Sequence, residues 1–216
     1  MMASVVAFAQ SERTTDFGGI LSAEASAGLG GNFGMSVEEE LRFDCGFTQF
    51  DRWLNSVGVD YTCLHNRMNI GLTADYIRRH NNDGYYENRG RIGLQVTYTE
   101  GYRRFKFQGR SKVIGTFFDE RTGEHRLNPR LYWRNRVKAT YQKPNSRFKY
   151  SLSAELFWLT NDPKGSYVDN VRTVLAVDYR LARRYSLSAF ARMDNDLQVK
   201  EPVDRFYLGL TLKAKY

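Results

Sequence analysis

The sequence contains few of the residues that usually identify a function directly. Its 216 residues include only 2 cysteines, 3 histidines and 4 prolines. Cys45 and Cys63 have no CxxC partner and no histidine at metal-ligand spacing, which argues against a zinc site and a redox motif. The scarcity of proline excludes a proline-rich disordered chain. We therefore predict a folded chain with no metal and no cofactor.

Long apolar runs are also missing. No segment approaches the roughly 18 consecutive apolar residues that a membrane-spanning helix needs, and this excludes a helical membrane protein. Aromatic residues, in contrast, make up 14% of the chain, and 32 Lys and Arg outnumber 24 Asp and Glu. A net charge of +8 favours nucleic acid, an anionic surface or an anionic solute as partner, with a mixed solvated surface as the alternative.

The first residues resemble a secretory signal. A short apolar run ends in Ala7-Phe8-Ala9, the small-x-small pattern of signal peptidase cleavage, although the usual basic segment before it is absent. We interpret residues 1–9 as the remnant of a signal peptide and residues 10–216 as one β-barrel domain. An ordinary apolar N-terminus is the alternative.

From Phe17 onward apolar and polar residues alternate with a period of two, which is typical of β-strands with one apolar and one polar face. Tight turns and longer polar loops alternate between these segments, as in a single up-and-down meander. Eleven segments show the pattern, at roughly 17–29, 32–44, 49–63, 67–76, 91–98, 102–117, 130–142, 147–158, 169–180, 184–194 and 206–216.

The segments are long enough to cross a bilayer as tilted strands. The positions of their charged residues indicate which face of the sheet contacts water. With the apolar rows outside, nineteen basic side chains face the lumen; each would cost about 2–4 kcal/mol near the bilayer midplane. The opposite orientation would leave a wide apolar lumen. We therefore predict an all-β, up-and-down antiparallel transmembrane β-barrel of 10–12 strands. Twelve is favoured because bacterial barrels usually have an even number, and an odd barrel is the minority option.

Aromatic residues of the apolar face fall into two groups, as the girdles of a membrane barrel do. One group lies near the tight turns: Tyr61, Tyr98, Phe105, Tyr141, Phe148, Tyr179, Tyr185 and Tyr216. The other lies toward the long loops: Phe43, Trp53, Tyr76, Phe117, Trp133, Trp158 and Phe206.

A few residues do not fit the alternation. Three polar ones fall on the apolar face, and five apolar ones fall in the lumen; a β-bulge would explain such shifts of register. They are Glu39, Asn55 and Asn135 outside, and Ile114, Phe157, Leu159, Val174 and Phe190 inside.

Several short motifs resemble an uncharacterised family of bacterial outer-membrane β-barrel proteins, number twenty-four ninety in the domain-of-unknown-function series. They are Asp16-Phe17-Gly18, Glu38-x-Glu40-x-Arg42, Asp51-Arg52-Trp53, Glu87-Asn88-Arg89-x-Arg91 and Glu155-Leu156-Phe157. The chain departs from the family at Gly19-Ile20, where a Trp is expected. The resemblance implies a barrel in the bacterial outer membrane, with outer-membrane lipid around it, and supplies no activity. Terminal Tyr216 also resembles the signal read by the barrel-assembly machinery.

The predicted lumen is basic on one side. A basic wall comprises Arg89, Arg91, Arg104, Arg110, Arg134, Arg136, Lys138 and Arg147, and an acidic group comprises Glu38, Glu40, Asp60 and Asp75. Facing walls of opposite sign resemble the constriction of a diffusion pore, and the basic excess favours anions. We predict a passive porin-like channel that leans towards small anionic solutes. A plugged, non-conducting structural barrel is the alternative, because buried Glu–Arg networks are tolerated when fully matched.

An outer-leaflet hydrolase is a third option with little support. Its only candidates are Glu124-His125 and His80 near Asp83, and lone loop histidines are usually just solvated, so we predict no enzyme and no catalytic residue. Nucleic acid is not expected either, because alternation puts the rings and cations of residues 103–107 on opposite faces. Cys45 follows the second segment at the long-loop end and Cys63 ends the third at the tight-turn end, so the two lie far apart and no disulfide is expected.

Overall fold

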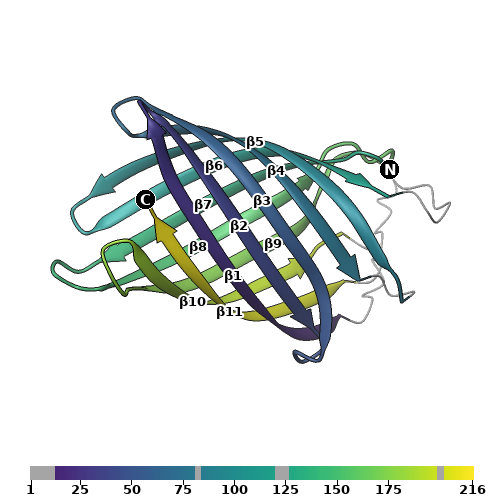
Figure 1. Ribbon diagram of the computed structural model, residues 1–216. Coiled ribbons are helices and arrows are strands. Elements are labelled where there is room, and N and C mark those ends of the chain that lie inside the picture. The colour runs from purple at the N-terminus through teal and green to yellow at the C-terminus, as the bar shows by residue number, and fades with distance from the viewer. Residues whose placement is uncertain (1–12, 81–83, 120–126, 199–201) are drawn as a thin grey trace, which may run out of the picture.

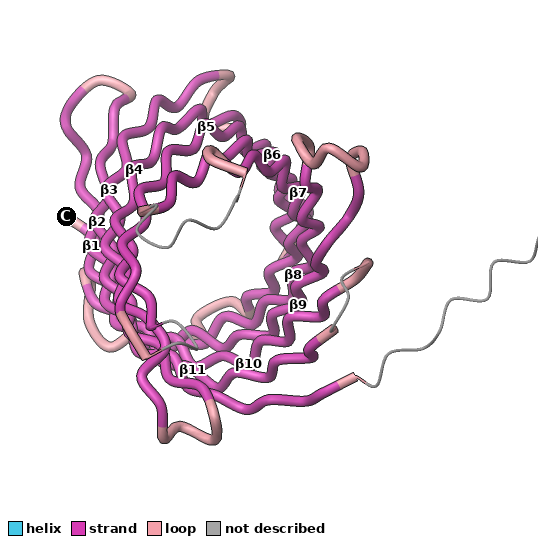
Figure 2. Tube along the Cα trace, turned by 90° about the vertical axis from the view of Figure 1, so that its right-hand side faces the viewer, coloured by secondary structure: helices cyan, strands magenta, loops and turns pink. Residues whose placement is uncertain are grey.

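The computed structural model describes residues 13–80, 84–119, 127–198 and 202–216, and it is a closed β-barrel (Figure 1). The strands are β1 (Thr14–Gly30), β2 (Phe33–Asp44), β3 (Gln49–Cys63), β4 (Met68–His80), β5 (Tyr86–Tyr102), β6 (Phe105–Phe118), β7 (Arg130–Gln142), β8 (Phe148–Leu159), β9 (Tyr167–Arg180), β10 (Tyr185–Asp196) and β11 (Val203–Lys215). The predicted alternation is therefore confirmed as eleven strands that follow one another around a single lumen (Figure 2).

The barrel closes through a parallel pair of strands. Every pair of consecutive strands is antiparallel, whereas β1 and β11 run in the same direction, from the Thr14↔Val203 register to Ser26↔Lys215. An odd number of alternating strands leaves the first and last strands parallel, and a parallel ladder still satisfies both edges. Eleven lies within the predicted range, but the preference for twelve is not met by the described residues.

The two ends of the barrel differ as the sequence predicts. The β1–β2, β3–β4, β5–β6, β7–β8 and β9–β10 connections are short turns. The β1–β2 turn contains Gly30 and Gly31 with φ of 98° and 57°, a conformation that glycine adopts without steric cost. The opposite end carries the longer connections, apart from the compact β2–β3 loop. We refer to these as the tight-turn end and the long-loop end.

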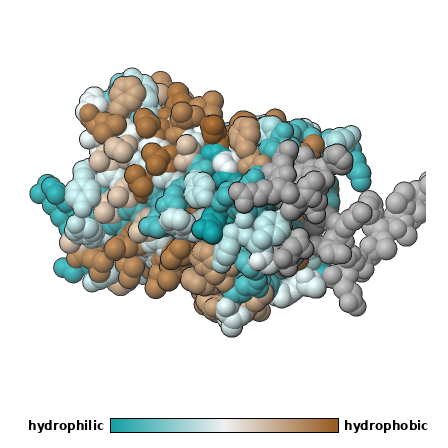
Figure 3. All heavy atoms as spheres, turned by 45° about the vertical axis from the view of Figure 1, so that its right-hand side comes forward, coloured by the Kyte–Doolittle hydropathy of each residue, from teal (hydrophilic) through white to brown (hydrophobic). Residues whose placement is uncertain are grey.

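The alternation also sets which side chains face outward. Leu94, Val137 and Leu152 are 56%, 65% and 54% exposed, whereas Asp75 and Glu155 are buried. Hydrophobic residues cover much of the exterior in Figure 3, and hydrophilic residues protrude at its left end. No helix among the described residues is long and apolar enough to cross a membrane.

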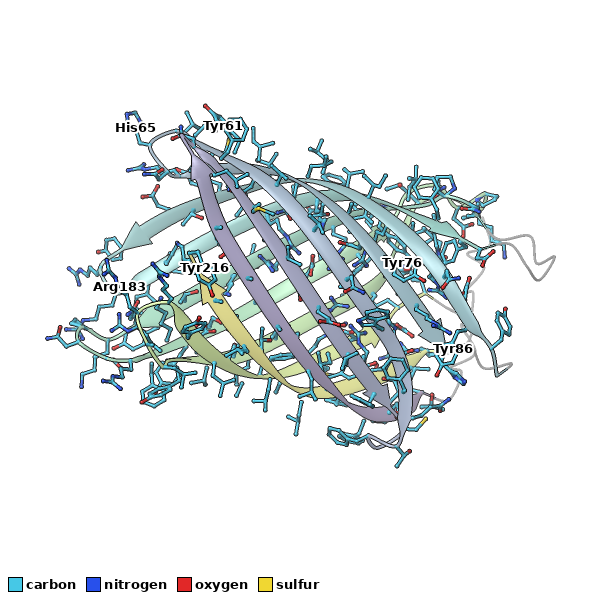
Figure 4. All side chains as sticks on the ribbon, in the orientation of Figure 1. Tyr61, His65, Tyr76, Tyr86, Arg183 and Tyr216 are labelled. Atoms are coloured by element: carbon cyan, nitrogen blue, oxygen red, sulfur yellow. The ribbon has the colours of Figure 1, made fainter. Side chains whose placement is uncertain are left out.

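Aromatic side chains of neighbouring strands meet at both ends of the exterior. At the tight-turn end Phe105 contacts Tyr141, Phe148 contacts Tyr179, and the Tyr185 and Tyr216 hydroxyls are 3.1 Å apart. At the long-loop end the Trp133 and Trp158 rings stack, as do Phe17 and Phe206. Figure 4 shows Tyr61 and Tyr216 toward one end and Tyr76 and Tyr86 toward the other. The two predicted aromatic groups therefore lie at opposite ends of the barrel.

β-Bulges do not explain the exceptions to the alternation, and that interpretation was wrong. Glu39 stays outside, where its carboxylate accepts a 2.8 Å hydrogen bond from Trp53 Nε1. Ile114 and Leu159 stay inside, where they are 2% and 0% exposed. The sheet does shift its register between Arg42 and Phe43, and between Phe157 and Trp158.

These two shifts each leave one acidic residue, Asp51 in β3 and Asp169 in β9, without a partner in the ladder. Both carboxylates are buried, and their partners lie on the inward rows of the barrel. The bulges thus add charge to the lumen and do not correct the apolar pattern.

One inward aromatic residue packs against a glycine of the next strand. Phe190 lies opposite Gly209, and a Cβ built on Gly209 would approach the Phe190 ring to 2.1 Å. Gly109 on β6 has nothing within 4 Å of the same position. The Phe190 ring therefore covers Gly209 on the lumen side, which is why an inward phenylalanine is accommodated.

We expect Gly209→Val to destabilise the barrel by about 1–3 kcal/mol, because the added side chain overlaps the Phe190 ring. Urea unfolding in lipid vesicles, followed by tryptophan fluorescence, would measure the change. Gly109→Val is the matched control and should have little effect. Adding Phe190→Ala to Gly209→Val should recover part of the loss; equal losses in both valine variants would contradict this packing.

Candidate functional site in the barrel lumen

Buried carboxylates on the inward face each hold two arginines. Glu155 accepts hydrogen bonds from Arg110 at 2.6 Å and from Arg134 at 2.9 and 3.0 Å. Asp194 accepts from Arg172 at 2.7 Å and from Arg192. Both carboxylate side chains are at most 7% exposed, so these ion pairs are poorly screened by solvent.

Two inward aromatic rings connect these ion pairs. The Phe157 ring lies between the guanidinium groups of Arg134 and Arg172, which are 4.1 and 4.7 Å from its centroid. The Tyr207 ring lies in the same way between Arg42 and Arg192, at 5.1 and 5.3 Å. Cations above an aromatic face are attracted by the ring quadrupole, and the attraction strengthens away from water.

We call the resulting set the ion-pair belt. It continues from Arg42 to Glu40 through a 2.6 Å ion pair. Its contacts join strands that are neighbours or are separated by one strand, so the belt follows the barrel wall. Its members are Arg110, Arg134, Glu155, Phe157, Arg172, Asp194, Arg192, Tyr207, Arg42 and Glu40, on β6 to β11 and β2.

The size of the barrel leaves space inside this belt. Eleven strands spaced about 4.8 Å apart and tilted by about 40° enclose a backbone cylinder roughly 22 Å across. Inward side chains from opposite walls fill part of that width. The remaining space forms cavities that follow one another along the barrel axis.

Three lumen cavities each have several basic residues in their lining. A 500 Å³ cavity at the long-loop end is bounded by Arg52, Arg79, Arg89, Arg91 and Arg130. A 390 Å³ cavity farther in is bounded by Arg110, Arg134, Arg136 and Lys138 with Glu24 and Glu38. A 290 Å³ cavity at the tight-turn end is bounded by Arg147, Lys149, Arg180, Arg183, Arg184 and Lys215 with Asp178.

Most of the predicted basic wall lies inside the barrel. Arg89 pairs with Glu87 at 2.7 Å and Arg91 with Asp75 at 2.5 Å, while Arg110 and Arg134 belong to the belt. Arg136 and Lys138 line the 390 Å³ cavity, and neither has an ion pair within the described ranges.

Arg104 and Arg147 do not lie on the inner wall. Both are exposed at the tight-turn end, in the residues just before β6 and β8. The β5–β6 turn includes Arg103 with φ of 55°, so the strand that carries Arg104 in the prediction begins only at Phe105. Arg147 still borders the 290 Å³ cavity at the mouth.

The predicted acidic residues are also on the inward face but are held differently. Glu40 belongs to the belt, and Asp75 binds Arg91 and accepts a 2.5 Å hydrogen bond from Ser56. Asp60 accepts a 2.6 Å hydrogen bond from Asn69. Glu38 lies opposite Glu24 in the β1–β2 register and has no ion pair among the residues that the structure describes.

Some residues of the site are missing from the predicted set. Arg42 lies on the inward row between Glu40 and Asp44, so the alternation alone could have placed it there. Asp51 and Asp169 could not be found in this way, because bulges turn them inward. The ring contacts of Phe157 and Tyr207 depend on three strands each, and no local sequence signal indicates them.

The candidate hydrolytic residues do not assemble into a catalytic set. His80 Nδ1 is 3.1 Å from Gln49 Nε2, and its ring contacts Tyr86. His65 is in the β3–β4 turn (Figure 4), whereas His125, Glu124 and Asp83 lie outside the described residues. Cys45, in the β2–β3 loop, and Cys63, at the end of β3, are both free cysteines. The described residues contain no cluster that could hold a metal ion.

We expect Glu155→Gln to destabilise the barrel by about 3–5 kcal/mol, because Arg110 and Arg134 lose a buried counter-charge. Glu100→Gln, which breaks an exposed pair with Arg67, is the control and should cost less than about 1 kcal/mol. Urea unfolding in vesicles would compare the two. A Glu155→Gln barrel as stable as the parent would show that the belt contributes nothing to folding.

Comparison with known proteins gives a family but no activity. No curated protein matches the chain. Among solved structures, the anion-selective porin from Comamonas acidovorans aligns with 84% of this chain and 53% of its own length, at 12% identity and a TM-score of 0.39. The chain spans about half the length of that porin, and a likeness this weak does not establish a shared activity. The family model described as "Protein of unknown function (DUF2490)" matches residues 18–201, which confirms the resemblance drawn from the sequence motifs. The chain therefore belongs to the DUF2490 family of proteins of unknown function.

Proposed function

We propose that the protein is a passive pore of the bacterial outer membrane that favours small anionic solutes. The observation that carries this proposal is an excess of inward cations without a carboxylate partner. Lys112, Arg136, Lys138 and Lys149 have no ion pair within the described part of the chain, and they come from neighbouring strands β6, β7 and β8. Fixed positive charge in a confined lumen lowers the energy of an anion and raises that of a cation.

The distribution of these cations supports a path along the axis. The belt lies between the 500 Å³ cavity and the tight-turn end, and three carboxylates, Glu40, Glu155 and Asp194, hold its five arginines. Nearer the tight turns, Lys138 borders the 390 Å³ cavity and Lys149 the 290 Å³ cavity, while Lys213 borders both. An anion that passes the belt would therefore meet these lysines, beside Glu24, Glu38 and Asp178, before it leaves the barrel.

The proposed location follows from the exterior. Strands of 12 to 17 residues are long enough to cross a hydrocarbon layer at a tilt. The outward rows are apolar between two groups of aromatic residues, as membrane barrels require. Residues 1–9, interpreted as a signal peptide remnant, lie outside the described residues.

A plugged structural barrel is the second candidate, and the ion-pair belt favours it. Buried Ile20, Leu54, Ile77, Ile114 and Leu159 also occupy the inward face. Together with the belt they narrow the lumen without serving a solute. This candidate predicts a stable barrel with no conductance, so one recording distinguishes it from the pore. Neither candidate requires catalysis, and we propose no enzymatic role.

We expect planar-bilayer recordings to show discrete openings whose reversal potential in a salt gradient indicates anion preference. Lys138→Gln should lower the anion-to-cation permeability ratio about twofold or more, most clearly at low salt where the lumen charge is least screened. Lys164→Gln removes an equal charge from the exposed β8–β9 loop and serves as the control. A silent bilayer, or preference for cations, would overturn the pore proposal and leave the barrel intact.

A further inference from the structure

The cavity at the long-loop end differs from the belt in how its arginines are held. We call it the arginine vestibule: a 500 Å³ cavity bordered by Arg52, Arg79, Arg89, Arg91 and Arg130. These residues come from β3, β4, β5 and β7, so the cations surround the space from several strands. Among the residues that the structure describes, no acidic residue borders the cavity.

Buried carboxylates fix three of these arginines from behind. Asp51 accepts hydrogen bonds from Arg52 Nε at 2.5 Å and Arg79 Nε at 3.1 Å, and Asp75 accepts from Arg91 Nε at 2.5 Å. Asp51 and Asp75 are 5% and 7% exposed. Each carboxylate thus orients its arginine from the wall of the barrel, outside the cavity.

The terminal nitrogens of the same three arginines remain uncommitted. Within the described ranges, no hydrogen bond involves the Nη atoms of Arg52, Arg79 or Arg91. Two arginines of the belt are held differently: Arg134 and Arg172 each use both Nε and Nη2 on one carboxylate. An arginine held only through Nε keeps its other donors for a second oxyanion.

Apolar and aromatic groups border the rest of the vestibule. Ile77, Phe118, Leu127 and Tyr132 line it. The Arg130 guanidinium lies 5.5 Å from the Tyr132 ring centroid and has no carboxylate partner among the described residues. Oriented donors beside an apolar surface are typical of a small-molecule site, in which polar groups set orientation and apolar walls bury area.

We infer that the vestibule binds a compact organic anion that carries two or more carboxylate or phosphate groups. Its oxyanions would accept hydrogen bonds from the Nη groups of Arg52, Arg79 and Arg91, and its carbon skeleton would lie against Phe118 and Leu127. A solute with one charged group would leave most of these donors unused. As a solute class for the lumen this inference rests on the proposed pore, but the binding itself does not require conduction.

The test is calorimetric titration of the purified full chain in uncharged detergent micelles. Benzene-1,3,5-tricarboxylate is the probe, and benzoate is the matched anion with one carboxylate on the same ring. We expect the tricarboxylate to bind at least about tenfold more tightly, because several oriented guanidinium groups act on one molecule. Equal affinity for the two anions would overturn the inference.

Variants at the two ends of the barrel separate a built site from general positive charge. Arg79→Gln should weaken tricarboxylate binding about tenfold or more, and Arg79→Lys, which keeps the charge but loses the planar fork, should weaken it about threefold or more. Arg183→Gln, at the tight-turn end (Figure 4), should leave the affinity within about twofold. If Arg183→Gln weakens tricarboxylate binding as much as Arg79→Gln does, or if Arg79→Lys binds the tricarboxylate like the parent, the proposed site is incorrect.

Loss of folding must be distinguished from loss of binding. Heat-modifiable migration on gels reports whether each variant forms a closed barrel. Arg130→Gln is a second variant, at a side chain with no carboxylate partner among the described residues, and it should also weaken tricarboxylate binding. If Arg130→Gln and Arg79→Gln both fold and both bind the tricarboxylate as tightly as the parent, the inference is overturned. Tight tricarboxylate binding together with a silent bilayer would support the vestibule and contradict only the pore.

Discussion

Charge enclosed by a sheet must be paired or hydrated, and the rest of this structure depends on that constraint. A barrel with apolar rows outside sends every second residue of each strand into its lumen, and here many of those residues are arginines. The belt resolves part of the problem, since two arginines share Glu155 and two share Asp194. Aromatic rings between the guanidinium groups separate like charges that would otherwise face one another.

The same residue types do two kinds of work in the lumen. Where an arginine binds one carboxylate through two nitrogens, as Arg134 binds Glu155 through Nε and Nη2, most of its donors face that carboxylate and its role is structural. Where it is held through Nε alone, as Arg91 is by Asp75, the remaining donors are oriented but uncommitted. The bulge at Asp51 contributes to this second arrangement, because it adds a carboxylate that holds Arg52 and Arg79 together. An irregularity of the sheet thus increases the number of oriented cations at the vestibule.

Much of the fold could be predicted because the alternation of apolar and polar residues can be recognised within a single strand. Around Leu94 in β5 and Leu152 in β8, for example, it identifies the strand and the face that points outward. The lengths of the connections then distinguish the two ends of the barrel. The number of strands was harder, because the general preference for even barrels favoured twelve, whereas an eleven-strand barrel closes through the parallel β1–β11 ladder. No signal within one strand reports how the first and last strands meet.

The site could be predicted only in outline. The inward rows show that Arg110, Arg134 and Glu155 share a lumen, but which carboxylate holds which arginine depends on the register between strands. Asp51 and Asp169 lie inside because of bulges, and the Phe157 and Tyr207 contacts join residues from three strands. Arg104 shows the opposite error: β6 begins at Phe105 and not at residue 102, and this moves a predicted lumen residue into an exposed turn.

The orientation of the strands is best tested by adjacent spin labels on β8. Leu152 faces outward and is 54% exposed, whereas Ser153 is on the inward row and borders the 390 Å³ cavity. In a variant without Cys45 and Cys63, a single cysteine at each of these two positions would carry a spin label in lipid vesicles. The relaxation of each label by oxygen, which concentrates in hydrocarbon, would be compared with its relaxation by a water-soluble nickel complex. We expect oxygen to relax the Leu152→Cys label more strongly and nickel the Ser153→Cys label. The reverse order would mean that hydrocarbon-facing and water-facing rows have been exchanged.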